Sequence, residues 1–69
     1  MPSSYAVYAR RLAKRIQNKG GPDEILDRLN DAVILKEADL ALGKLSPQVH
    51  IQLVGSCMIA EEWIKNHGE

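Results

Sequence analysis

Apolar residues recur at steps of three and four along most of the chain, which is the periodicity of amphipathic α-helices. The first such segment covers residues 4–19, where Tyr5, Tyr8, Leu12 and Ile16 share one face. Two longer segments cover residues 22–43 and 47–66. The strict alternation that indicates strands is absent. The sequence therefore predicts a small all-α domain of three helices, with residues 1–69 as a single unit.

The two longer helices are separated only by Lys44-Leu45-Ser46, so they are expected to form an antiparallel hairpin. Pro47 suits the first position of a helix, and Ser46 suits the capping position before it. Gly20-Gly21 ends the first helix and lets it fold back along the hairpin. The expected core brings together Tyr5, Leu12 and Ile16 of the first helix, Ile25 and Leu29 of the second, and Ile64 of the third, with Trp63 at its edge.

The second helix changes the direction of its apolar face near its middle. Up to Val33 the apolar side chains share one face, but from Ile34 onward most of them lie on the opposite face, and Lys36 occupies the first one. Either the helix breaks between Val33 and Lys36, or its two halves face different neighbours. We favour the continuous helix because no breaker lies in this stretch. In the third helix Gly55 is expected to make room for Leu35.

A chain of 69 residues is short for the apolar surface it carries. Such a chain buries only about 60% of its unfolded surface and is marginally stable alone. Cys57 is the single cysteine, so an internal disulfide is excluded. The first helix, at about 24 Å, is too short to cover hairpin arms of about 30 Å. We therefore expect an apolar patch at the turn end, which forms a homodimer seam or a partner site and consists of Ile34, Ala38, Ala41, Ile51, Val54 and Met58. The alternative is a kinked second helix that buries this surface within one chain.

Charge is balanced over the chain but unevenly placed. Nine basic and nine acidic residues cancel, yet residues 1–19 hold five cations and no acid. Four of these cations, expected to steer the protein to an acidic partner, are Arg10, Arg11, Lys14 and Arg15. The same residues could grip nucleic-acid phosphates. The zero net charge and the position of both tyrosines on the apolar face favour the protein partner.

Candidate chemistry is sparse. Asp23, Asp27 and Asp31 form a row on one helix face, which we interpret as a solvated surface because hard-cation sites usually draw ligands from several segments. Cys57 falls on the apolar stripe, where a thiol behaves as a small hydrophobe. His50 has no acid or nucleophile near it in sequence. We expect no enzymatic activity, no cofactor and no metal. The lack of a long apolar run predicts a cytoplasmic protein that does not enter a membrane.

These patterns together predict a small non-enzymatic regulator, inhibitor or adaptor. It would bind another protein by packing its helices against it, and it would form a homodimer. The alternative is a transcriptional regulator that binds nucleic acid through the basic face of the first helix.

Overall fold

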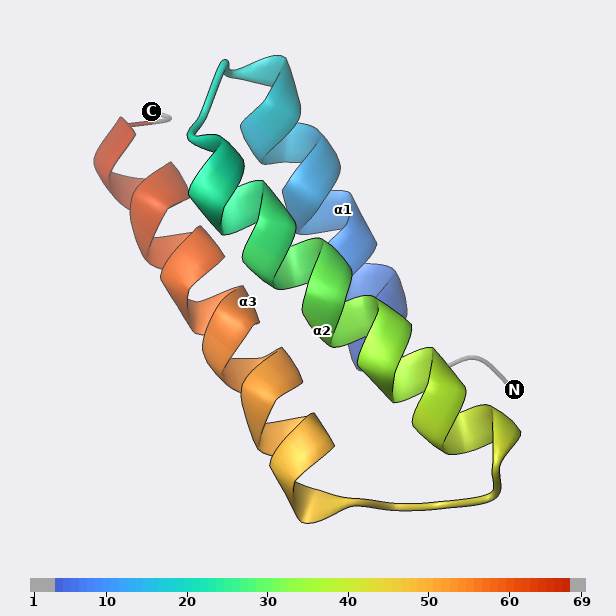
Figure 1. Cartoon of the computed structure of the whole chain (residues 1–69). Coiled ribbons are helices and arrows are strands. Elements are labelled where there is room, and N and C mark those ends of the chain that lie inside the picture. The colour runs from blue at the N-terminus through green and yellow to red at the C-terminus, as the bar shows by residue number, and fades with distance from the viewer. Residues whose placement is uncertain (1–3, 68–69) are drawn as a thin grey trace.

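The computed structural model describes residues 4–67 and consists of three helices. They are α1 (Ser4–Asn18), α2 (Asp23–Ala41) and α3 (Pro47–His67). Each helix packs against both others, and α2 and α3 form the antiparallel hairpin along which α1 lies (Figure 1). The bundle is elongated, measuring 38 × 18 × 17 Å. The prediction of an all-α three-helix domain is confirmed, with helix ends within two residues of those expected.

Both α1 and α2 end in the same glycine-dependent turn. Gly20 and Gly43 have φ angles of 70° and 69°, a left-handed conformation that glycine adopts without a steric penalty. Behind each glycine, the next backbone N–H reaches back to a carbonyl of the last turn: Gly21 N donates to Ile16 O at 2.8 Å, and Lys44 N donates to Asp39 O at 2.9 Å. The glycine at position 43 therefore stops α2 at Ala41.

The core lies along the shared axis of the three helices and is built from small and branched side chains. Its fully buried members include Leu12, Ile16, Leu29 and Leu53. Ile25 and Ile64 are buried as expected, and Trp63 packs against the edge of the core. The complete set is Ala6, Ala9, Leu12, Ile16, Ile25, Leu29, Ala32, Val33, Leu53, Cys57, Ala60 and Ile64.

The expected core position of the two tyrosines is wrong. Tyr5 and Tyr8 are each 38% exposed, while Ala6 and Ala9 take the inward positions of α1. These small residues fill the inward side of α1, and the larger rings lie at its rim. There the Tyr8 hydroxyl donates a hydrogen bond to Glu61, and the Tyr5 ring meets His50 edge-on at 5.6 Å.

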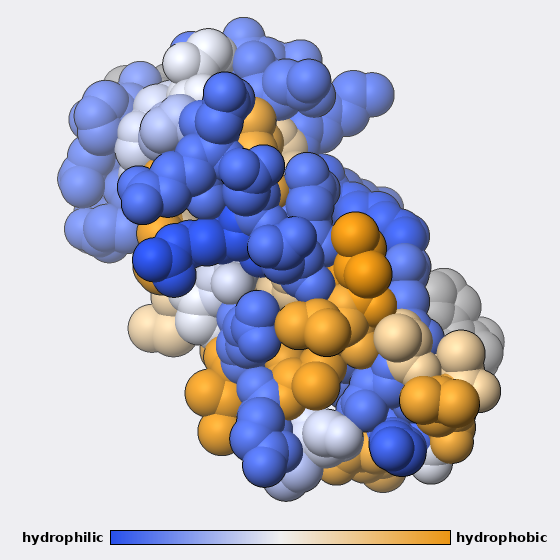
Figure 2. Space-filling model, in the orientation of Figure 1, coloured by the Kyte–Doolittle hydropathy of each residue, from blue (hydrophilic) through white to orange (hydrophobic). Residues whose placement is uncertain are grey.

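Helix α2 is continuous through Val33 and Lys36, as favoured from the sequence. The C-terminal part of α2 from Ile34 onward, here called distal α2, nevertheless keeps the same side toward the core as the N-terminal, or proximal, half of the helix. Lys36 and Asp39 are therefore buried on the inward side, although they are charged. The apolar residues of this half consequently point away from the bundle, which Figure 2 shows as hydrophobic colour over the distal part of α2.

The expected reason for the exposed turn end also needs correction. Helix α1 has 15 residues against 19 in α2 and 21 in α3, but Tyr5 near its start contacts His50 in the first turn of α3. Thus α1 does reach the turn end of the hairpin. Apolar side chains stay exposed there because they project from the sides of α2 and α3 that face away from the bundle. Helix α1 packs against the other sides of these two helices and therefore cannot cover them.

The close-packing role expected of Gly55 belongs instead to Gly21. A Cβ built on Gly55 meets nothing within 4 Å, so Gly55 does not make room for Leu35. A Cβ on Gly21 would instead collide with Ile16 Cγ2 and lie 3.0 Å from Trp63 Cη2. Close packing therefore requires glycine at the turn between α1 and α2.

Candidate functional site

Distal α2 exposes a set of apolar side chains on the side that faces away from the bundle. Ile34 is 62% exposed and Leu42 is 70% exposed, and Leu35, Ala38 and Ala41 are exposed between them. We call these five residues the outward α2 face. At about 100° per residue, Ile34, Ala38 and Ala41 lie within about 60° of the direction opposite Leu29. The proximal half of the same side carries Asp23, Glu24, Asp27 and Asp31, so one helix side changes from acidic to apolar along its length.

Asp39 holds the C-terminal end of α2 in the rotation that produces this face. Its carboxylate accepts hydrogen bonds from the backbone N–H and the hydroxyl of Ser46, both at 2.8 Å. These two donors therefore tie the last turn of α2 to the start of α3. Lys36, one turn earlier, is 7% exposed and buries its aliphatic stem on the same inward side. With the inward positions taken by these two residues, Ile34, Ala38 and Ala41 must face outward.

The pKa of Asp39 offers a test of this tie. The backbone N–H of Ser46, then its hydroxyl, lower this pKa below its usual value of 3.8. A carboxyl whose folded-state pKa is depressed contributes stability above its unfolded pKa, and that contribution is lost as pH falls through the folded value. We expect the wild-type melting temperature to exceed that of Asp39→Asn by several degrees at pH 7, and the gap to close below about pH 4.

Thermal melts followed by circular dichroism between pH 7 and pH 2.5 would measure this gap. Asp27→Asn is the matched control, because Asp27 is exposed on the outward side of the same helix. A gap that stays constant over the whole pH range would show that the Asp39 charge does not hold the turn.

A second apolar stripe lies on α3 and consists of Ile51, Val54 and Met58. Ile51 is 69% exposed and Met58 is 62% exposed, while Val54 is half-buried. Val54 lies at helical spacing between His50 and Glu61, the two α3 residues that contact the tyrosines of α1. The α3 stripe therefore borders α1.

The six residues expected to form one patch thus fall into two groups. Ile34, Ala38 and Ala41 lie on α2, beside Glu37, which pairs with Arg10 of α1. The other three lie on α3, beside the tyrosine contacts of α1. Helix α1 therefore meets both α2 and α3 at the inner borders of the two groups. Leu35 and Leu42 also belong to the apolar surface on α2 but were not predicted as part of the patch, although their helical spacing from Ala38 is the signal that identifies them.

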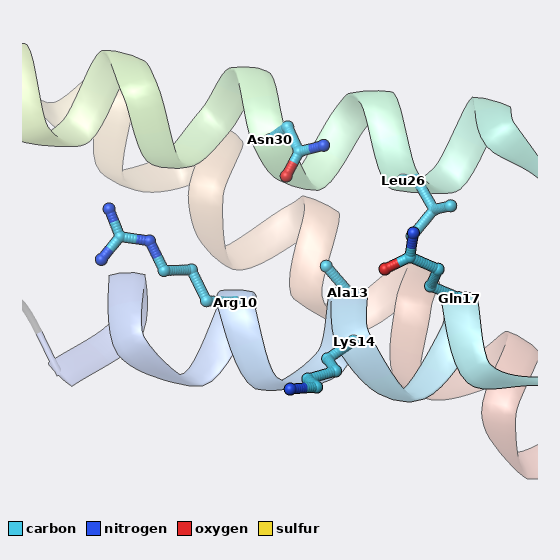
Figure 3. A pocket seen from close by; sticks show the side chains of 6 residues that line it. All are labelled: Arg10, Ala13, Lys14, Gln17, Leu26 and Asn30. Atoms are coloured by element: carbon cyan, nitrogen blue, oxygen red, sulfur yellow. The ribbon is translucent and has the colours of Figure 1, made fainter.

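The four basic residues of α1 do not act as one cluster. Arg10 forms an ion pair with Glu37 of α2, so its charge is partly satisfied within the chain. Arg11, Lys14 and Arg15 are exposed. Lys14 and Arg10 line an open groove of about 340 Å³ between α1 and α2, together with Ala13, Gln17, Leu26 and Asn30 (Figure 3). The mixed lining of this groove includes only one large apolar side chain and offers no specific chemistry.

The residues considered for catalysis or metal binding are dispersed. Within residues 4–67, no three His, Cys, Asp or Glu side chains gather closely enough to hold a metal ion. The aspartates at positions 23, 27 and 31 are exposed, and His50 is exposed against the edge of Tyr5. Ser56 and Cys57 are both buried. Within residues 4–67 we therefore identify no nucleophilic side chain paired with a general base.

Cys57 is expected to be chemically inert in the native protein. Its thiol is buried in the core, and this burial raises its pKa. Because the thiolate is the reactive form, we expect the native thiol to react with a disulfide reagent at least about a hundredfold more slowly than the unfolded chain. Absorbance of the released thiol measures the rate. The control Cys57→Ala/Met58→Cys carries an exposed thiol and should react at the unfolded rate, whereas equal rates in both proteins would contradict the buried position.

Comparison of the chain with protein families, curated sequences and solved structures finds no match. Among the described helices, none combines the length and apolar character needed to cross a membrane. The class of protein rests on the fold and the surface described above. It is a small all-α domain whose hairpin exposes apolar side chains on its outward faces.

Proposed function

We propose that this protein is a small non-enzymatic binding module that acts as a regulator, inhibitor or adaptor and associates with itself. The outward α2 face carries the proposal. A helix that turns Lys36 and Asp39 inward and five apolar residues outward leaves its apolar side in water unless a second molecule covers it. Packing another helix on such a face is a common mode of protein recognition.

The apolar area of the outward α2 face favours association of moderate strength. Exposed apolar patches of a few hundred Å² usually mark interaction sites. A dimer buries such a patch on both copies, and about 250 Å² on each yields roughly 12 kcal/mol at about 25 cal/mol per Å². Association also costs at least about 4 kcal/mol in lost freedom of motion. We therefore expect a monomer–dimer equilibrium in the micromolar range, with the α3 stripe as a further surface for a different protein.

The positive charges of α1 favour a partner whose contacting surface is acidic. Arg11, Lys14 and Arg15 are exposed, whereas the acidic side chains at positions 23, 24, 27 and 31 lie on α2. Exposed cations raise the rate of encounter with an acidic surface more than they raise the final affinity. Arg10 contributes less because Glu37 already pairs with it.

Self-association is tested by light scattering coupled to size exclusion, over a concentration series from about 1 μM to 1 mM that spans the expected range. The wild type should shift from monomer to dimer, and Ile34→Lys should stay monomeric with an unchanged fold. Asn30→Lys is the matched control, since it adds the same charge at an exposed position one turn earlier. A wild type that is monomeric throughout would overturn self-association. A pull-down in which wild type and Ile34→Lys capture the same proteins would overturn partner binding through this face.

Nucleic-acid binding is the second candidate, supported by the exposed Arg11, Lys14 and Arg15 of α1. It is weakened by the Arg10–Glu37 pair and by the hydrogen bond that ties Tyr8 to Glu61, because both hold groups that would otherwise contact phosphates or bases. This candidate requires DNA or RNA binding that falls steeply with salt and disappears in Arg11→Glu/Lys14→Glu. Unretarded nucleic acid at low salt would exclude it.

A further inference from the structure

We propose that two copies of the chain pair antiparallel along their outward α2 faces, with the two-fold axis passing beside Ala38. This inference rests on the proposed self-association and assigns its geometry. The partner is a second copy of this chain, and the contact places Asp31 of one copy beside Lys44 of the other.

The first support is the self-complementary spacing of the outward α2 face. In an antiparallel pair centred on Ala38, Ile34 of one copy faces Leu42 of the other, and Leu35 faces Ala41. Leu35, Ala38 and Leu42 follow the three- and four-residue steps of a helix–helix seam. Ile34 and Leu42 therefore pack as two large side chains, and Leu35 packs over the small Ala41. The same five residues form the contact on both copies, as a two-fold interface requires.

The second support is the small side chain at the centre. Ala38 and Ala41 are exposed and carry only a methyl group. Small residues at a helix crossing let the two backbones approach closely, so that the flanking Ile34, Leu35 and Leu42 interdigitate around them. The larger side chains around Ala38 thus leave a shallow groove for the second helix at the position of the two-fold axis.

The third support is charge, which selects the antiparallel direction. Asp27 and Asp31 continue the outward side of α2 toward its N-terminus, and Lys44 follows its C-terminal end. The backbone N–H of Lys44 is held on Asp39 O at 2.9 Å, so this lysine stays at the helix end. An antiparallel pair brings each Asp31 to a Lys44 of the other copy. A parallel pair would place like charges side by side, which is unfavourable.

The geometry is tested by oxidative cross-linking of single-cysteine additions. Ala38→Cys should form a disulfide-linked dimer readily, because the two positions meet at the axis and a disulfide spans about 5.5 Å between Cα atoms. Asp27→Cys is the control, since it lies on the same side of the same helix but beyond the contact. The wild type controls for Cys57, which is buried. Met58→Cys reports a dimer formed through the α3 stripe instead.

A charge exchange tests the register independently. Asp31→Lys and Lys44→Asp should each weaken dimerisation about two- to tenfold, and the double variant should recover it, because exposed ion pairs make contributions of this order. Light scattering and sedimentation give the dissociation constants. Additive rather than compensating effects in the double variant would overturn the register.

The outcomes separate this inference from the proposed function. Dimers that cross-link through Ala38→Cys and not through Asp27→Cys support the antiparallel pair. Dimers that cross-link through Met58→Cys, or equally at positions 38 and 27, overturn it while self-association stands. A wild type that stays monomeric in light scattering overturns both.

Discussion

Replacing Leu29 with alanine is expected to lower the free energy of unfolding by about 2–5 kcal/mol. Leu29 is fully buried in the N-terminal half of α2, where it packs within the core shared by all three helices. The truncation removes buried methyl groups and leaves a cavity that neighbouring helices cannot fully close. Since small domains hold roughly 0.05–0.15 kcal/mol per residue, a chain of 69 residues has between roughly 3 and 10 kcal/mol in total. Leu29→Ala therefore removes a large share of the stability.

Urea denaturation followed by circular dichroism measures this loss. Leu42→Ala makes the same chemical change at the residue that caps the C-terminal end of α2, a position that is 70% exposed, and it should shift the free energy of unfolding by less than about 0.5 kcal/mol at low protein concentration. A larger effect of Leu42→Ala that grows with concentration would report association instead. Equal losses in the two variants at low concentration would contradict the assignment of the inward and outward sides of α2.

Replacing Gly21 with alanine is expected to destabilise the protein by about 1–3 kcal/mol. The added Cβ would collide with Ile16 Cγ2 and lie 3.1 Å from the Ile16 carbonyl oxygen, and the side chain and backbone of Ile16 are fixed by the end of α1. The Trp63 ring on the other side of the turn, which stacks on His67, also limits the space. Relief of the collision therefore requires α1 or α3 to move.

Gly55→Ala provides the matched control and should change stability in the opposite direction. Gly55 lies within α3, and a Cβ there meets nothing within 4 Å. Alanine loses less backbone entropy than glycine on forming a helix, so we expect a gain of about 0.5–1 kcal/mol. Calorimetric melts of both variants give the comparison. A Gly21→Ala protein as stable as Gly55→Ala would refute the close packing of the α1–α2 turn.

The helices themselves could be predicted from the sequence because their signals are local. The steps of three and four that include Leu12 and Ile16, the paired Gly20-Gly21 and the Ser46-Pro47 start are visible without knowledge of the fold. The continuity of α2 followed from the absence of a breaker near Val33. The apolar excess at Ile34, Ala38 and Ala41 was also a property of the sequence pattern, and the structure shows these residues exposed.

Packing details could not be predicted because they depend on which side of each helix faces the other two helices where these pack closely together. The tyrosines of α1 and the alanines beside them compete for the same inward direction, and only the crossing of the helices decides that Ala6 and Ala9 take it. Likewise, periodicity alone does not distinguish Gly21, which lies against Ile16, from Gly55, which faces open space.

The sequence by itself determined three helices, their turns and an excess of apolar side chains over what one small core can bury. The tertiary structure alone decided where that excess appears, since Ile25, Leu29 and Val33 pack in the core shared with α1 and α3 and thereby turn the apolar side of distal α2 outward. The physical reason is that periodicity records only the relative angles of side chains around a helix. Its absolute rotation is set by contacts between segments distant in the chain.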